Sequence, residues 1–249
     1  MTLCTVVFGL PLLVLLLASF AGHWDALWPS SPTWANLRGV LASAEERAAL
    51  WHSVATAGAA TVCALVLGAW GALAGRRLGR RTRICVDTLF VLPITVPSVT
   101  VGLALLVTFS RPPLLWNGTV SLVVLTHVAL VASYAYANAK AGLERLPAHL
   151  EEMAASLGGS PWFVLRKVTL ALLMPHLLAG AALGFALSMG ELGATIMLYP
   201  PGWATAPVEI FSLSDRGSVF SAAALSLALL AATATALVAL ERWAASRRH

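Results

Sequence analysis

The chain has 249 residues, of which 59% are hydrophobic and only 11% are charged. Water-soluble domains carry roughly 45–50% apolar and about 25% charged residues, so this composition excludes an ordinary soluble domain and favours a protein that folds in a lipid bilayer. The net charge of +5 would suit nucleic-acid binding in a soluble protein, but in a membrane protein it is typical of basic residues held at one membrane face.

Six segments of the chain are apolar enough and long enough to cross the ~30 Å hydrocarbon core of a bilayer as helices. Unbroken apolar runs such as LPLLVLLLASFA favour helices over the alternating strands of a membrane barrel. In chain order, the predicted spans are 3–21, 50–73, 84–109, 119–138, 168–189 and 219–240. The sequence therefore predicts an all-α integral membrane protein with about six transmembrane helices in a single membrane domain, 1–249.

The first predicted span has the length and the following small residues of a secretory signal peptide. A signal peptide begins with basic residues, however, and the segment Met1 to Cys4 includes no Lys or Arg. We therefore expect residues 1–21 to be retained as the first transmembrane helix.

The basic residues fall unevenly on the two sides of these spans. If the N-terminus is cytoplasmic, the outer segments hold only a small share of the 16 Lys and Arg residues, namely Arg38, Arg47, Arg111 and Arg216. The others lie in the inner segments, many of them in the cluster GRRLGRRTR between the second and third spans. Because cytoplasmic loops are rich in Lys and Arg, we expect both termini in the cytoplasm and interpret the cluster as a topology anchor rather than a nucleic-acid site.

The predicted inner loop 139–167 is longer than a connection between two spans needs to be. Some of its apolar residues recur at helical spacing and form one predicted stripe: Leu143, Leu146, Leu150, Met153 and Leu157. Gly158-Gly159 can supply a left-handed helix end, and Ser160-Pro161 has the residue types of an N-cap and a first helical position. The loop therefore predicts a helix, a glycine break and a second helix. The stripe could pack on its own membrane domain, on lipid or in a groove of a partner.

The segment EEMAASLGGSPWFVLRKVTLALLMP in this loop resembles the EAA loop of binding-protein-dependent permeases, the membrane subunits of ATP-binding-cassette (ABC) importers. Glu152, Ala154 and Gly158 match the Glu, the second Ala and the Gly of that motif, whereas Met153 and Ala171 depart from it. The resemblance extends over residues 50–243 and implies the type I importer permease fold.

The resemblance also implies a role for the loop 139–167 as the site that couples the permease to a cytoplasmic ATPase. The implied coupling residues are Leu150, Glu152, Ala154, Leu157 and Gly158. In this role Glu152 would fix the loop by hydrogen bonds, and Gly158 would allow a sharp turn where a Cβ would clash.

The partners of the chain are implied in the same way. They are a dimer of cytoplasmic ATP-binding subunits, a second permease subunit (the same chain or a homologous one), an extracytoplasmic solute-binding protein and the lipid of a bacterial inner membrane. The sequence has no GxxxxGKS/T phosphate loop, so we expect the partner to hydrolyse ATP and the chain itself not to be an enzyme. It has no HExxH motif and no CxxC pair, so we expect no metal and no cofactor.

Polar and helix-breaking residues gather in and after the third to fifth spans. Pro93 and Pro97 interrupt the third span, and irregular backbone inside a membrane is tolerated where it lines a cavity. Glu191 follows the fifth span, where an ionisable residue is a candidate for function. The predicted pathway residues are Thr95, Ser98, Tyr134, Asn138, Ser188, Glu191 and Thr195. The alternative for each is a structural role in holding helices together or in ending one.

The segment GELGATIMLYPPGWATAPVEIFSLSDRG resembles permeases of 2-aminoethylphosphonate importers. We therefore expect a phosphonate as the solute, with sulfate, molybdate, ferric iron or polyamine as alternatives within the family. A secondary transporter driven by an ion gradient would show internal repeats and charges at the membrane midplane. A membrane redox enzyme would show paired His residues or clustered carboxylates. Neither pattern is evident, so both classes are weaker alternatives.

Overall fold

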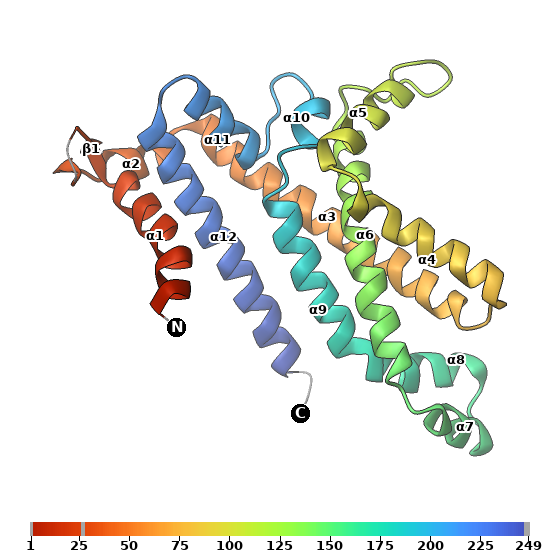
Figure 1. Ribbon diagram of the computed structural model, residues 1–249. Helices are drawn as coiled ribbons and strands as arrows, with labels where there is room; N and C mark the ends of the chain where they lie inside the picture. Colours follow the sequence, from red (N-terminus) through yellow and green to blue (C-terminus); the bar gives the residue numbers. More distant parts are fainter. Residues whose placement is uncertain (1, 26–27, 247–249) are drawn as a thin grey trace.

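The computed structural model describes residues 2–25 and 28–246, and the described chain is helical almost throughout (Figure 1). The helices are α1 Thr2–Ser19, α2 Ala35–Ala42, α3 Ala44–Gly75, α4 Arg80–Thr95, α5 Ser98–Phe109, α6 Val120–Glu144, α7 Ala148–Ser156, α8 Pro161–Val164, α9 Leu170–Met189, α10 Thr195–Leu198, α11 Ala206–Asp215 and α12 Val219–Ser246. A π-helix, Leu165–Thr169, joins α8 to α9. Two short strands, β1 Ala21–His23 and β2 Ser30–Pro32, pair antiparallel, with Ala21 opposite Pro32.

Hydroxyl side chains cap the start of several helices. Ser43 Oγ accepts a hydrogen bond from the backbone N–H of Glu46 at 3.2 Å, so α3 begins before the predicted boundary at residue 50. Ser160 caps α8 in the same way, and Pro161 occupies the first helical turn, as predicted. These caps supply acceptors for backbone N–H groups that have no partner inside the helix.

Four helices of the described chain are long and apolar enough to cross a membrane: α3, α6, the continuous helix Pro161–Met189 and α12 over Val219–Ala244. The bent pair α4–α5 raises this number to five if the pair forms one span. The all-α membrane fold is confirmed. Among the described residues, α1 adds the apolar stretch Gly9–Ser19, which is shorter than the helices counted as spans.

The third predicted span, 84–109, is wrong as a single helix. α4 ends at Thr95, α5 begins at Ser98, and the two helices meet at an angle of 106°. Pro97 has no N–H for the helical ladder and pushes the residue before it out of the helical region. Val96 is accordingly extended, with φ −102° and ψ 135°. The chain therefore turns sharply within an apolar stretch.

The core of the described chain is formed by α3, α6 and α9. Small residues bring α3 and α6 together, since a Cβ on Gly68 would stand 2.6 Å from the backbone nitrogen of Tyr136. Phe90 of α4 stacks on Tyr136 with ring centroids 4.3 Å apart. Beside this core, α12 lies between α1 and α9, and α7 and α8 lie at the end of the bundle where α9 begins (Figure 1).

Candidate functional site

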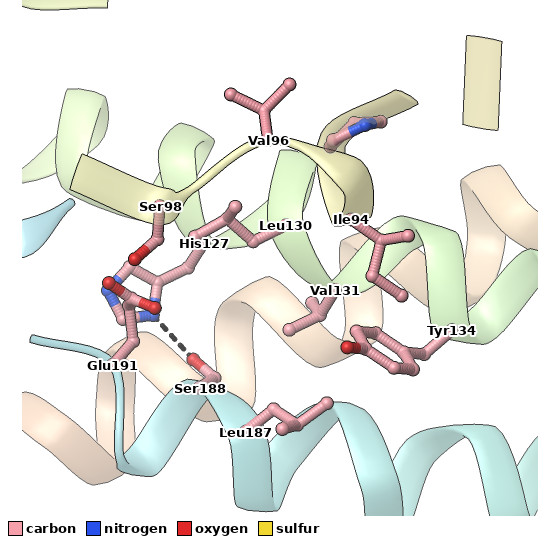
Figure 2. A pocket seen from close by; sticks show the side chains of 11 residues that line it. Ile94, Val96, Ser98, His127, Leu130, Val131, Tyr134, Leu187, Ser188 and Glu191 are labelled. Atoms are coloured by element: carbon pink, nitrogen blue, oxygen red, sulfur yellow. Dashed lines mark hydrogen bonds between the residues drawn. The ribbon is translucent and has the colours of Figure 1, made fainter. Parts of the chain in front are cut away.

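A cavity of about 230 Å³ lies at the bend between α4 and α5 (Figure 2). α6 and the end of α9 form its other walls. Its lining residues are Pro93, Ile94, Val96, Ser98, His127, Leu130, Val131, Tyr134, Leu187, Ser188 and Glu191. Apolar side chains thus surround a small number of polar groups, which is typical of a site for a small molecule.

His127 is held through both of its ring nitrogens. It lies in the first half of α6 and is only 1% exposed. Nδ1 lies 2.6 Å from Ser188 Oγ, a hydrogen bond drawn in Figure 2, and Nε2 lies 2.8 Å from Thr195 Oγ1. The ring therefore connects α6 to the last turn of α9 and to α10. His127 is absent from the predicted pathway residues, although a polar residue inside an apolar span is the signal that could have identified it.

Glu191 and two glycines shape the loop between α9 and α10. Glu191 Oε1 accepts a hydrogen bond from the backbone N–H of Ala194 at 2.7 Å, so this carboxylate supports the start of α10 as well as lining the cavity. A Cβ on Gly193 would stand 2.5 Å from Ser98 Oγ, and a Cβ on Gly102 would stand 2.8 Å from the Cα of Ala194. The loop and α5 approach this closely because both positions lack a side chain.

The structure brings most of the predicted pathway residues together. Ser98, Tyr134, Ser188 and Glu191 line the cavity, and Thr195 lies behind it through its hydrogen bond to His127. Two predicted residues lie outside the lining. Thr95 donates to the carbonyl of Leu92 at 2.8 Å, and Asn138 donates to the carbonyl of Tyr134 at 2.9 Å. In the described part of the chain, no three His, Cys, Asp or Glu side chains gather closely enough to hold a metal ion.

The long loop folds into a helix, a glycine break and a second helix, but its predicted apolar stripe is divided. α7 begins at Ala148, so Leu143 belongs to α6, where it is buried. On α7 and at its end, Met153 and Leu157 are 58% and 87% exposed. Leu150 and Ala154 are half-buried, and Trp162 and Phe163 of α8 are exposed. The loop thus exposes the apolar side chains of Met153, Leu157, Trp162 and Phe163, which together we call the loop surface.

Gly158 ends α7 with a φ of +85°, and a Cβ placed on it would meet open space. The expected Cβ clash at this position is therefore wrong, because the left-handed backbone, and not crowding, requires the glycine. Crowding occurs at the next residue, where a Cβ on Gly159 would stand 2.6 Å from the carbonyl oxygen of Ala154.

Glu151, the neighbour of Glu152, makes the hydrogen bonds that hold α7. Its carboxylate accepts from both terminal nitrogens of Arg76 at 3.0 Å each, and its Oε1 accepts from Thr169 Oγ1 at 2.6 Å. The Arg76 guanidinium lowers the pKa of Glu151 below its ordinary value. Glu152 is exposed, and within the described residues its carboxylate has no hydrogen-bond partner. The family resemblance implied that Glu152 fixes the loop by hydrogen bonds; within the described chain, the bonds that hold α7 come from Glu151.

Known proteins resemble this chain over a range that includes both the cavity and the loop. Residues 64–245 match the family model of the binding-protein-dependent transport system inner membrane component. A relative from Salmonella typhimurium, provisionally named the 2-aminoethylphosphonate transport system permease protein PhnV, is 45% identical over 95% of this chain and 89% of its own. The molybdenum transport system permease protein ModB of Mycobacterium tuberculosis is 32% identical over 83% of this chain and 82% of its own.

Solved structures agree with the sequence relatives in fold. A crystal structure of a bacterial ABC transporter involved in the import of the acidic polysaccharide alginate contains a similar chain, with a TM-score of 0.71 at 16% identity over 97% of this chain and 92% of that one. The bacterial alginate ABC transporter in complex with its pentasaccharide-bound periplasmic protein gives a TM-score of 0.73 at 17% identity, over 94% of this chain and 90% of that one. The chain belongs to the binding-protein-dependent transport system inner membrane components, and it is the multi-pass permease, a non-catalytic membrane subunit, of an ABC importer.

Proposed function

We propose that this chain, with a second permease subunit, encloses a pathway for 2-aminoethylphosphonate across the bacterial inner membrane. An extracytoplasmic solute-binding protein delivers the solute, and a dimer of cytoplasmic ATP-binding subunits drives the transport. Both termini and the loop surface lie on the cytoplasmic side. The substrate assignment is supported by the identity of 45% to the relative named for 2-aminoethylphosphonate, against 32% to the one named for molybdenum.

The pathway is assigned to the cavity at the α4–α5 bend. The observation that carries this assignment is the convergence of polar groups from α5, α6 and the end of α9 on one cavity within apolar segments. One wall of the cavity belongs to helices that are poorly covered, since Leu89 of α4 and Leu103 of α5 are 69% and 49% exposed. The second permease subunit packs against these two helices and closes the pathway.

The loop surface is assigned to the contact with the ATP-binding subunit. Met153, Leu157, Trp162 and Phe163 are exposed apolar side chains on α7, at its end and at the start of the helix Pro161–Met189, and exposed apolar groups are typical of binding surfaces. A short helix that presents an apolar face can lie in a groove of a partner. Glu152 is free to contact that groove, and Leu150 and Ala154 support α7 from its half-buried side. When the ATP-binding dimer closes, α7 moves and the permease changes from inward-open to outward-open.

The substrate is tested by uptake of labelled 2-aminoethylphosphonate in a strain that lacks this chain, with and without the chain restored. Excess sulfate, molybdate and ferric citrate serve as competitors. We expect restored uptake that only phosphonates compete away. Uptake that molybdate abolishes, or a restored strain that takes up no phosphonate, would overturn the substrate assignment.

The loop contact is tested by a matched pair of substitutions on exposed leucines. Leu157→Asp places a charge on the loop surface, and Leu41→Asp places one on α2, where Leu41 is 70% exposed. We expect Leu157→Asp to abolish co-purification of the ATP-binding subunit and Leu41→Asp to leave it unchanged. Equal co-purification with both variants would overturn the loop contact.

A further inference from the structure

A polar cluster of Arg76, Glu151 and Thr169, which we call the bracket, joins three elements at one end of the helix bundle. Arg76 is the residue that ends α3, Glu151 lies in the first turn of α7, and Thr169 is the last residue of the π-helix. The Glu151 carboxylate receives hydrogen bonds from both terminal nitrogens of Arg76 and from the Thr169 hydroxyl. Each of its two oxygens is therefore used, and one of them is used twice.

The bracket differs from an ordinary surface ion pair. Thr169 is only 3% exposed, and the guanidinium and carboxylate meet through two parallel hydrogen bonds, a geometry that fixes orientation as well as distance. The nearby pair of Arg83 and Glu144 has one hydrogen bond of 3.1 Å between two more exposed side chains, and such pairs contribute little. The bracket is thus a contact of defined geometry between α3, α7 and the π-helix.

Two short connections join α7 to the rest of the chain. One is the link through Leu146 and Pro147 after α6, and the other is the Gly158–Gly159 turn before α8. The main packing partners of α7 are the short α8 and the π-helix. α3, by contrast, packs along both α6 and α9, which form walls of the cavity. The bracket is therefore a polar side-chain connection between α7 and the core of the protein.

The π-helix gives the bracket a second point of attachment. A π-helical turn is rare and frequently occurs at functional sites, and here it joins α8 to the membrane-spanning α9. Because its last residue, Thr169, donates to the same carboxylate that pairs with Arg76, one side chain holds α7 to the start of α9 and to the end of α3.

We propose that the bracket makes α7 move as one body with α3 and α9, so that Glu151 and Arg76 are positioning residues that convert movement of the ATP-binding subunit into movement of the pathway. This inference rests on the proposed contact between the loop surface and the ATP-binding subunit. It assigns to Glu151 a role different from that of Glu152, which stays free for the partner. Loss of the bracket therefore uncouples ATP hydrolysis from transport, whereas the ATP-binding subunit stays bound.

The test uses the complete transporter in proteoliposomes with the variants Glu151→Gln, Arg76→Gln and the exchanged pair Glu151→Arg with Arg76→Glu. The exchanged pair keeps the summed reach of the two side chains and restores opposite charges. Three quantities are measured at equal protein amounts: the ATP-binding subunit retained on the purified permease, the rate of ATP hydrolysis, and the solute transported per ATP. Arg80→Gln, which removes another exposed arginine close by, is the control.

We expect both single variants to retain the ATP-binding subunit and to hydrolyse ATP, with transport per ATP reduced by about tenfold, a factor that corresponds to about 1.4 kcal/mol. The exchanged pair recovers most of the loss, and Arg80→Gln transports like the wild type. Unchanged transport per ATP in Glu151→Gln would overturn the inference, and so would an exchanged pair no better than the single variants. A wild-type chain that binds no ATP-binding subunit would instead overturn the proposed function.

Discussion

At the scale of single residues, His127 is expected to keep α10 attached to α6. His127→Leu leaves the hydroxyls of Ser188 and Thr195 buried and without this partner. An unsatisfied buried group costs about 1–3 kcal/mol, so we expect stability to fall by an amount in that range. We expect uptake to fall about tenfold, because a loss of about 1.4 kcal/mol corresponds to a factor of ten. Unfolding in denaturing detergent and uptake at matched protein amounts measure the two effects.

The control for this prediction is His23→Leu, because His23 lies exposed on β1. The control should change neither stability nor uptake. If His127→Leu behaved like His23→Leu in both measurements, the link between α6 and α10 would be irrelevant to transport.

Gly158 allows a test of why a glycine ends α7. A left-handed backbone costs about 1–2 kcal/mol for a residue with a Cβ, whereas Asn adopts this conformation more readily than other residues. We therefore expect Gly158→Ala to weaken co-purification of the ATP-binding subunit several-fold and Gly158→Asn to retain more of it, although Asn is larger. The opposite order, with Asn worse than Ala, would mean that space and not backbone conformation limits this position.

At the scale of elements, the contact between α5 and the loop before α10 depends on Gly102. A Cβ there would stand 2.8 Å from both the Cα and the carbonyl oxygen of Ala194, whereas a Cβ on Gly58 of α3 would meet nothing within 4 Å. We expect Gly102→Ala to push α5 away from the loop and to reduce uptake, at a cost of about 1–3 kcal/mol for overpacking. Gly58→Ala should be neutral or slightly stabilising, because Ala favours helix over Gly by about 1 kcal/mol.

Uptake and unfolding of the two glycine variants, measured side by side, separate a local clash from a general effect of adding a methyl group. Similar losses in both variants would contradict the importance of the α5 contact.

The attachment of α7 is expected to depend on pH through Glu151. Arg76 lowers the pKa of this carboxyl group, so its contribution to stability is present above the ordinary pKa of a glutamate, about 4.3. The contribution is lost only as the pH falls through the lower value of the folded protein. A nitroxide label on Met153→Cys, introduced after the native cysteines are replaced by Ser, should therefore stay immobile at neutral pH and throughout the ordinary glutamate range. It should become mobile below that range.

The matched variants are Glu151→Gln, which should be mobile at every pH, and Glu152→Gln, which should keep the wild-type profile. A label that loosens already above the ordinary glutamate pKa would show that another group controls α7.

At the scale of the whole molecule, the sequence predicts what local physics controls. The thickness of a bilayer sets the length of the apolar helices, and Ser160-Pro161 and Gly158 end or begin helices through their own backbone preferences. The proline break in the third span was also visible in the sequence. The angle of 106° between α4 and α5 could not be predicted from the sequence. The bend is accompanied by close packing of α5 against the loop before α10, which is distant along the chain.

The side-chain partners of His127 and Glu151 could not be predicted from the sequence either, because they lie far away along the chain. His127 meets Ser188 and Thr195, which lie 61 and 68 residues away along the chain. Glu151 and Glu152 are neighbours, but successive residues of a helix point about 100° apart, so only one of them faces Arg76. The register of α7 against α3 decides which, and no local pattern encodes that register.

The assembly as a whole is tested by asking which exposed apolar face meets a second permease subunit. Leu103 of α5 and Val238 of α12 are 49% and 46% exposed, so cysteines at the two positions should be similarly accessible. In a variant whose native Cys4, Cys63 and Cys85 are replaced by Ser, we expect Leu103→Cys to cross-link with a second permease subunit that carries a cysteine at the matching position. We expect Val238→Cys to form no such product, because lipid covers α12.

A product twice the mass of this chain identifies a second copy, and another mass identifies a homologous chain. Cross-linking at Val238 but not at Leu103 would place the partner on the opposite side of the bundle and remove α4 and α5 from the pathway.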